Sequence, residues 1–421
     1  MHCYSINKNV NNDFTFKKVQ YGELNMKNRL ITIISATFIF LLTIFLPVAV
    51  NAEEITDNDF NFTLDLPEGF KVAGYTPDGM SYQFRHDRLP VDFVMKLYNY
   101  EETVPANKVL AATLKKLSAT YEGIGTFTWN DRICAITTFS SRATSEKGSK
   151  GWATGVPLMD GETVLVLLCY ADSDKANDCE QFIISSINSL CIGEDGNKTP
   201  GIITSYAYSG SKIRNIQLLI NGKTVQTSID EEDAEANQFV IDCEYAVLRL
   251  YASDPKWKEA WTRYYRAIYR DSHSRVQKAA FDIKTQFIGY AKKKNPENPE
   301  AVINEILLSW VQNFPYERAK DQKKSDFTNI PDILAGKGSD CDSRSMLLCC
   351  IMSHLGIKPE LFISREYSHA VYGLDLNLPG AKIEVNGTEF LLNETTAKGV
   401  RPGLMAKDMS DTEKWIPVLL P

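Results

Sequence analysis

Three residues near the C-terminus have types and an order that suit thiol-based catalysis: Cys341, His369 and Glu394. Cys341 begins a segment that reads as a buried helix, and a helix N-terminus favours a thiolate, so its thiol pKa should be lowered. His369 opens a strand-like segment and can act as a general base beside a cysteine. Glu394 ends a later strand-like segment, where a carboxylate can orient the imidazole. The sequence therefore predicts a Cys-His-Glu triad.

The residues around the nucleophile predict the helix that must position it. Ser339 or Asp340 is a natural N-cap, and the apolar residues that follow over 346–355 indicate a helix buried on nearly all sides. Cys349 and Cys350 lie in the middle of this helix, where a cysteine behaves as a small buried hydrophobe.

Two further residues are candidates for supporting roles. Gln312 lies in a helix expected over 303–313, and its amide could donate to the oxyanion of a tetrahedral intermediate together with the backbone N–H of Cys341. The alternative is a surface glutamine. Asn393 is a second candidate for the role given to Glu394.

These motifs resemble, in order, the transglutaminase-like core of bacterial cysteine peptidases, which shares the papain-like fold. The resemblance implies Cys341 as nucleophile, His369 as base and acid, and Glu394 as the acidic third member. The chain departs from the family pattern at Ser339, where glycine commonly precedes Asp-Cys, and at Glu394, where aspartate is usual. The matching segments are Phe314-Pro315-Tyr316, Gly338-Ser339-Asp340-Cys341-Asp342-Ser343-Arg344, Ser368-His369-Ala370 and Glu394-Thr395-Thr396.

Residues 57–195 are expected to form an α/β sandwich-type domain, in which no catalytic constellation appears. A binding or spacer role is therefore expected for it. The segment Leu66-Pro67-Glu68-Gly69-Phe70 resembles PsbP-like proteins. Apolar patterning predicts strands at 60–66, 91–99, 125–139 and 163–170, and helices at 106–121 and 179–190.

Residues 196–300 are expected to hold a linker, a hairpin and amphipathic helices. The linker is predicted at 196–210, and Asn221-Gly222 predicts a type I′ turn in a hairpin over 213–229. An apolar stripe from Trp257 to Phe287 predicts one amphipathic helix. Solvated positions are expected for Arg263, Arg266, Arg270, Lys278 and the acidic run 230–233, which lacks the pattern of a calcium loop.

The catalytic core is expected over 301–421, with the Cys-bearing helix packed on an antiparallel sheet. The predicted class of the whole chain is thus α+β: an N-terminal α/β sandwich-type domain followed by a papain-like, transglutaminase-like core.

The N-terminal residues carry a predicted targeting segment. Residues 30–50 are apolar and uncharged, follow Lys27 and Arg29, and precede Asn51-Ala52, which indicates a signal peptide or membrane anchor over 26–52. Residues 1–25 are polar and unpatterned and are expected to precede a true translation start at Met26. Either interpretation of 26–52 implies an extracytoplasmic protein: periplasmic, secreted or membrane-anchored.

Composition narrows the classes of function. The 421 residues carry a net charge of −7, which argues against nucleic-acid binding, and nine cysteines are too few for a disulfide scaffold. No cofactor or metal is expected. The expected function is a thiol-dependent amide hydrolase, or an acyltransferase, acting on protein or peptide substrates. The alternative is a catalytically inactive transglutaminase-like envelope protein that serves as a binding or structural module, and association with the membrane or cell envelope is left open.

Overall fold

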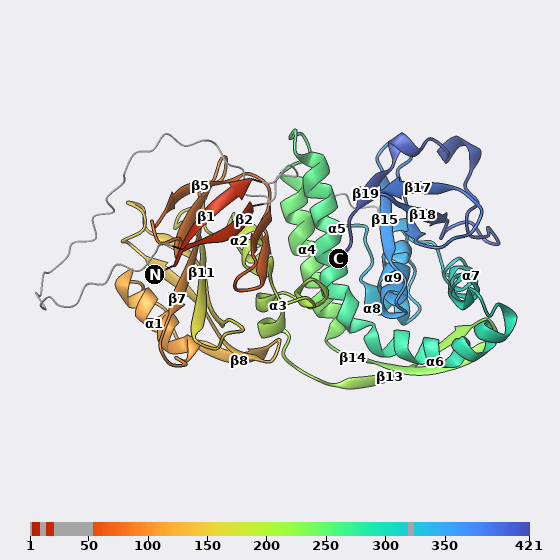
Figure 1. The fold of residues 1–421 in the computed structure, drawn as a ribbon, viewed down its shortest axis with the longest axis horizontal. Helices are drawn as coiled ribbons and strands as arrows, with labels where there is room; N and C mark the ends of the chain where they lie inside the picture. The colour runs from red at the N-terminus through yellow and green to blue at the C-terminus, as the bar shows by residue number, and fades with distance from the viewer. Residues whose placement is uncertain (1, 9–13, 21–53, 319–323) are drawn as a thin grey trace, which may run out of the picture. The chain divides into compact units, whose positions relative to one another are not determined.

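The computed structural model describes residues 2–8, 14–20, 54–318 and 324–421. The predicted segment 26–52 lies outside the described residues. The chain divides into two compact units, 1–194 and 195–421, both visible in Figure 1. Helices and largely antiparallel sheets occur together, so the α+β class is confirmed.

A seven-stranded antiparallel sheet with a helix on each face forms most of the first unit. Figure 1 shows α1 (Ala106–Lys116) and α2 (Glu180–Asn188) on opposite sides of this sheet. Buried residues of α1 pack with Ala135, Ala153 and Val166. In spatial order the strands are β5 (Phe70–Tyr75), β6 (Ser81–His86), β7 (Val91–Asn99), β11 (Thr163–Asp172), β10 (Ser149–Pro157), β9 (Arg132–Ser141) and β8 (Gly125–Trp129).

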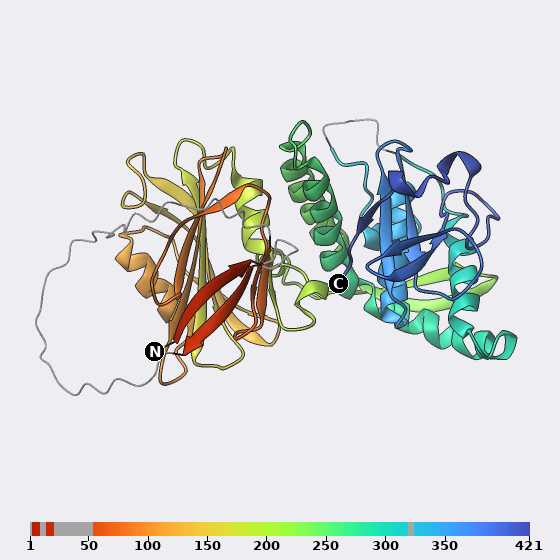
Figure 2. The same cartoon turned by 45° about the horizontal axis from the view of Figure 1, so that its top comes forward.

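A second sheet in this unit has five strands. The antiparallel pair β1 and β2, red in Figure 2, lies in the residues that precede Met26. The strands are, in spatial order, β1 (His2–Lys8), β2 (Phe14–Gln20), β3 (Glu54–Asp57), β4 (Phe62–Asp65) and β12 (Leu190–Ile192).

Most of the predicted elements of this unit are found, with shifted ends. The strands expected at 91–99 and 163–170 are confirmed as β7 and β11. The strand expected at 125–139 is two strands, β8 and β9, because Asn130 and Asp131 adopt positive φ values of 48° and 60° in a turn.

The second unit begins with short helices where a linker was expected. Within 196–210 the structure has η1 (Gly196–Lys198) and α3 (Ile202–Ala207), and the boundary between the two units falls directly before this segment. The hairpin prediction is confirmed by β13 (Ile213–Ile220) and β14 (Lys223–Asp230). Asn221 and Gly222 have φ values of 48° and 71°, as a type I′ turn requires.

The long helix predicted through Phe287 is two helices, α5 (Trp257–Arg275) and α6 (Gln277–Lys294). The break is at Val276. One turn earlier, His354 Nε2 donates to the carbonyl oxygen of His273 at 2.8 Å, which gives that carbonyl a partner outside the helix. The apolar stripe continues through the break, so the sequence pattern does not reveal it.

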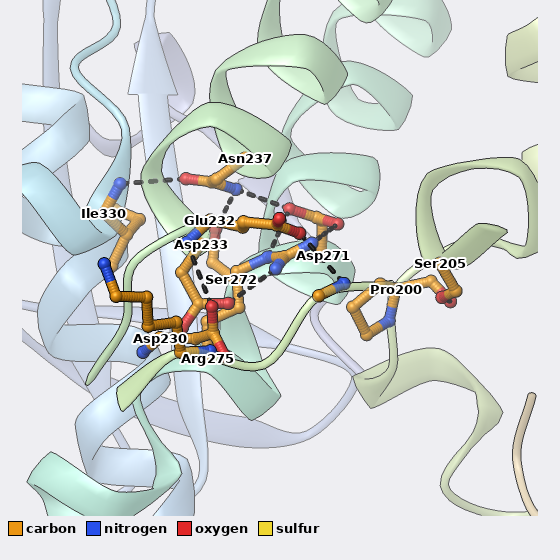
Figure 3. Close-up of polar contacts among 12 residues, drawn as sticks. Pro200, Ser205, Asp230, Glu232, Asp233, Asn237, Asp271, Ser272, Arg275 and Ile330 are labelled. Atoms are coloured by element: carbon orange, nitrogen blue, oxygen red, sulfur yellow. Dashed lines mark hydrogen bonds and ion pairs between the residues drawn. The ribbon is translucent and has the colours of Figure 1, made fainter. Parts of the chain in front are cut away.

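A buried polar network joins α4 (Asp233–Arg249), α5 and α8 (Ile330–Leu334), as Figure 3 shows. Asn237 donates to Asp271 Oδ2 at 2.7 Å and accepts from the backbone N–H of Ile330 at 2.9 Å. Arg275 bridges Asp271 at 2.9 Å and Asp233 at 2.7 Å. The expectation of a solvated helix start is therefore wrong for Asp233.

Two of the arginines on α5 are also buried rather than solvated. Arg263 forms an ion pair with Glu244 at 2.7 Å, and both side chains are 4% exposed. Arg270 is buried and donates to the carbonyl of Thr199 at 2.9 Å. A neighbouring acidic helix supplies the partner that allows Arg263 to be buried.

The C-terminal part of this unit is an antiparallel sheet with a buried helix on it, as predicted. Residues 341–352 of α9 (Cys341–His354) are all buried, and α9 packs on the two middle strands β15 and β16. The strands are, in spatial order, β17 (Lys382–Val385), β18 (Thr388–Asn393), β16 (His369–Leu374), β15 (Pro359–Ser364) and β19 (Ile416–Val418). The remaining helical segments are α7 (Pro299–Val311), η2 (Lys407–Met409) and η3 (Thr412–Lys414).

Among the helices of the described residues, none is long and apolar enough to cross a membrane.

Candidate active site

The starts of α9 and β16 and the end of β18 meet at one edge of the sheet. Because β16 and β18 are antiparallel, the first residue of β16, His369, and the residue after β18, Glu394, lie at the same edge. His369 Nε2 lies 2.7 Å from Glu394 Oε2, and the backbone N–H of Ala370 hydrogen-bonds the thiol of Cys341. His369 and Glu394 are thus in hydrogen-bond contact, and the Cys341 thiol lies at the backbone of the residue that follows His369.

The Glu394 carboxylate is held from two sides. Its Oε2 accepts from His369, and its Oε1 accepts from both the backbone N–H and the hydroxyl of Thr396, each at 2.6 Å. Burial alone would raise the pKa of Glu394, but the hydrogen bond and charge of His369 and the two Thr396 donors lower it to about 2. A lowered pKa favours the ionised carboxylate at neutral pH.

The Cys341 thiol lies in a less favourable environment for ionisation than the sequence predicts. Cys341 is 5% exposed. The N-cap of α9 is Asp340, whose side chain accepts a hydrogen bond from the backbone N–H of Ser343. Burial raises the pKa of the Cys341 thiol well above its ordinary value, and the charges of Asp342 and Asp340 raise it further. The backbone N–H of Ala370 and the charge of Arg318 lower the pKa, but by less. The direction of this shift is opposite to the lowered pKa that the sequence predicts.

A cluster of three carboxylates lies beside Cys341. The oxygens of Asp326, Asp340 and Asp342 lie within 4.8 Å of one another, and Tyr265 donates to Asp342 Oδ2 at 2.7 Å. Burial and the neighbouring Asp342 raise the pKa of Asp340 above its ordinary range. Carboxylate oxygens are the donors that hard cations prefer, so this set could hold one. The sequence analysis missed the cluster, although two of its members flank Cys341 directly.

Gln312 does not have a free amide for an oxyanion. It is 2% exposed, and its Nε2 donates to the carbonyls of Glu394 at 2.8 Å and Val400 at 2.9 Å. Its Oε1 accepts from the backbone N–H of Gly399 at 3.1 Å. Both proposed roles, oxyanion donor and surface residue, therefore disagree with the structure, and Gln312 instead holds the loop that follows Glu394.

Asn393 faces the interior and cannot replace Glu394. Its side chain is fully buried and donates to the carbonyl of Leu391 at 2.7 Å. Asn304 on α7 donates to Asn393 Oδ1 at 2.9 Å and accepts from the Tyr372 hydroxyl at 2.6 Å. Since neighbouring residues of a strand point to opposite sides, Glu394 remains the residue that reaches His369.

No protein-family model matches the chain, and no curated protein does. Among solved structures, the chain is similar to cyanobacterial PsbP (CyanoP) from Synechocystis sp. PCC 6803, with 11% identity and a TM-score of 0.27, over 33% of this chain and 91% of that one. It is also similar to the Saccharomyces cerevisiae Ran-binding protein Mog1p, with 11% identity and a TM-score of 0.25. This similarity covers 34% of this chain and 96% of that one. Such scores echo the PsbP-like resemblance only weakly and establish no function.

Proposed function

We propose that this protein is a thiol-dependent amide hydrolase with Cys341 as nucleophile, His369 as base and acid, and Glu394 as the residue that orients the imidazole. The observation that carries the proposal is the 2.7 Å contact between His369 Nε2 and Glu394 Oε2, made beside the Cys341 thiol. With Nε2–H donated to Glu394, the Nδ1 nitrogen is the one that exchanges a proton with the thiol.

In the first step the Cys341 thiol gives its proton to His369, and Sγ forms a C–S bond to the substrate carbonyl carbon while the carbonyl oxygen takes the electron pair. The imidazolium, stabilised by the ionised Glu394, returns that proton to the amide nitrogen as the C–N bond breaks. Water then attacks the thioester, with His369 as base, and the thiol leaves with its proton restored.

The same residues support two outcomes. Attack by water gives hydrolysis, and attack by an amine such as a lysine side chain gives transamidation. We favour hydrolysis of a protein or peptide substrate in an extracytoplasmic compartment. The compartment rests on the signal peptide or membrane anchor predicted over 26–52. The papain-like, transglutaminase-like character of the core is part of this proposal and rests on the motifs around Cys341, His369 and Glu394.

Iodoacetamide labelling with peptide mapping tests the triad without a known substrate. We expect Cys341 of the unmodified protein to be alkylated about 10²-fold faster at neutral pH than Cys341 of a His369→Ala variant, because general-base assistance is lost. Cys349, fully buried on the same helix, is the internal control and should stay unlabelled while the protein is folded.

Two results would separate the functions. Labelling that depends on His369 supports the hydrolase and justifies screening peptide libraries. Labelling of Cys341 that is slow and indifferent to His369 overturns the proposal and favours the alternative, an inactive envelope protein that acts as a binding or structural module.

A further inference from the structure

Arg344 is a fully buried arginine that lies on the first turn of α9 and is 1% exposed. Within the described ranges, no carboxylate forms an ion pair with it. Burying a guanidinium is costly unless its donors are satisfied, and an arginine buried without a carboxylate needs other acceptors. Those acceptors identify what the side chain holds in place.

All three nitrogens of the guanidinium donate hydrogen bonds. Nε donates to the hydroxyl of Ser339 at 3.2 Å, and Nη1 donates to the carbonyl of Thr395 at 3.4 Å. Nη2 donates to the carbonyls of Phe314 at 3.0 Å, Pro315 at 2.8 Å and Ser339 at 3.1 Å. Four of the five acceptors are backbone carbonyls, so the guanidinium fixes chain segments rather than side chains.

These segments are the ones that carry the triad. Thr395 directly follows Glu394, and its hydroxyl also donates to the carbonyl of Cys341 at 3.4 Å. Ser339, the residue at which the chain departs from the family's glycine, supplies two of the five acceptors. One planar side chain therefore joins the start of α9, the end of β18 and the loop at 314–315.

We propose that Arg344 is a positioning residue of this site: its guanidinium ties Thr395 to the start of α9 and so keeps Glu394 within hydrogen-bond reach of His369. The inference rests on the proposed function for its catalytic meaning. Lysine cannot take this role, because its single ammonium cannot direct donors into a planar fork toward separate carbonyls.

The test follows the His369–Glu394 hydrogen bond directly. Its imidazole N–H proton should give a far-downfield NMR resonance, assigned by its loss in His369→Ala. We expect the resonance to be lost in Arg344→Met and weakened in Arg344→Lys, with Cys341 alkylation at neutral pH about 10²-fold slower in Arg344→Met. Ser339→Ala keeps the arginine and removes one of its acceptors. We expect a smaller loss of the resonance in this variant, which provides the test if Arg344→Met fails to fold.

Arg275→Met is the matched control, because Arg275 is another buried arginine of the same unit that binds Asp271 and Asp233 instead. This variant should melt at a lower temperature yet keep the resonance and the alkylation rate of Cys341. Equal losses in Arg275→Met would overturn the inference, since any destabilised core would then behave alike.

Retention of the resonance in a folded Arg344→Met, or a resonance of undiminished intensity in both Arg344→Lys and Ser339→Ala, would also overturn it, as would its absence from the unmodified protein. Failure of the proposed function looks different. In that case the resonance is present and responds to Arg344, but Cys341 alkylation does not depend on His369 and no peptide is cleaved.

Discussion

At the scale of single residues, the hydrogen bonds to both carboxylate oxygens of Glu394 determine how a conservative substitution should behave. Two donors of Thr396 bind one carboxylate oxygen, and His369 binds the other. In Glu394→Gln, the Thr396 donors retain the amide oxygen, which turns the amide NH₂ toward His369 Nε2. The imidazole must then accept at Nε2 and carry its proton on Nδ1, the nitrogen that serves as base.

We therefore expect Glu394→Gln to be less active than Glu394→Ala, although it is the more conservative change. The rate of His369-dependent alkylation of Cys341 should fall by about 10²-fold or more in Glu394→Gln, because the wrong tautomer is held in place. In Glu394→Ala the imidazole can choose its tautomer and keeps part of the rate. A Glu394→Gln variant that is faster than Glu394→Ala would contradict this tautomer argument.

Gln312 offers a second contrast at this scale, between positioning and oxyanion stabilisation. Gln312→Ala leaves the carbonyls of Glu394 and Val400 and the N–H of Gly399 without their partner. The contact with the Glu394 carbonyl is buried and the other two are partly buried. A buried polar group left unpaired costs about 1–3 kcal/mol, so the free energy of unfolding should fall by about that amount. Urea denaturation of the variant and of the unmodified protein measures this loss of stability.

Alkylation decides which role Gln312 has, because iodoacetamide reacts with a thiol without forming an oxyanion. If Gln312 positions the Glu394 loop, Gln312→Ala slows alkylation of Cys341. If it were an oxyanion donor, alkylation would be unchanged and only turnover on an amide would fall. An unchanged melting curve and alkylation rate would show that the three hydrogen bonds are dispensable.

At the scale of elements, Glu360 links β15 to the residues after β19. Its Oε2 accepts from the backbone N–H of Leu420 at 3.1 Å, and its side chain is 2% exposed. Burial raises the pKa of Glu360 from 4.5 to about 7, against the Leu420 N–H and Lys358. The folded protein therefore binds this proton more tightly than the unfolded chain does.

The direction in which stability changes with pH follows from this difference in proton binding. The stabilisation from a protonated Glu360 is fully present below pH 4.5 and is lost as the pH rises through 7, at a cost of about 3 kcal/mol. Glu360→Gln keeps an acceptor for Leu420 and cannot ionise. Relative to the unmodified protein, it should gain stability between pH 4.5 and 8 in urea titrations. Parallel pH profiles for the two proteins would contradict the raised pKa.

The elements that bear Cys341, His369 and Glu394 were predictable because their signals are local. A capping residue followed by an apolar run predicts α9, and strand-like segments predict that His369 begins one strand and Glu394 ends another. The break at Val276 was not predictable, because the apolar stripe continues through it. The hydrogen bond from His354 to the carbonyl of His273 comes from a residue far away in the sequence. The role of Arg344 was not predictable either, since four of its acceptors are backbone carbonyls, which every residue type has.

At the scale of the whole molecule, the two units have separate hydrophobic cores. The first is built around α1 and includes Leu110 and Val166, and the second surrounds α9 and includes Leu348 and Tyr372. Cys341, His369, Glu394, Gln312 and Arg344 all belong to 195–421. A unit of this size with its own core is expected to fold alone.

A fragment of residues 195–421 should therefore fold cooperatively and alkylate Cys341 at the rate of the full chain, with the same dependence on His369. The fragment 54–194 should fold separately and leave its buried cysteines, such as Cys134 and Cys169, unlabelled. Circular dichroism melts and peptide mapping of both fragments beside the full protein measure this. A fragment 195–421 that melts cooperatively but loses the fast labelling would show that the site requires the first unit, although none of its proposed residues comes from there.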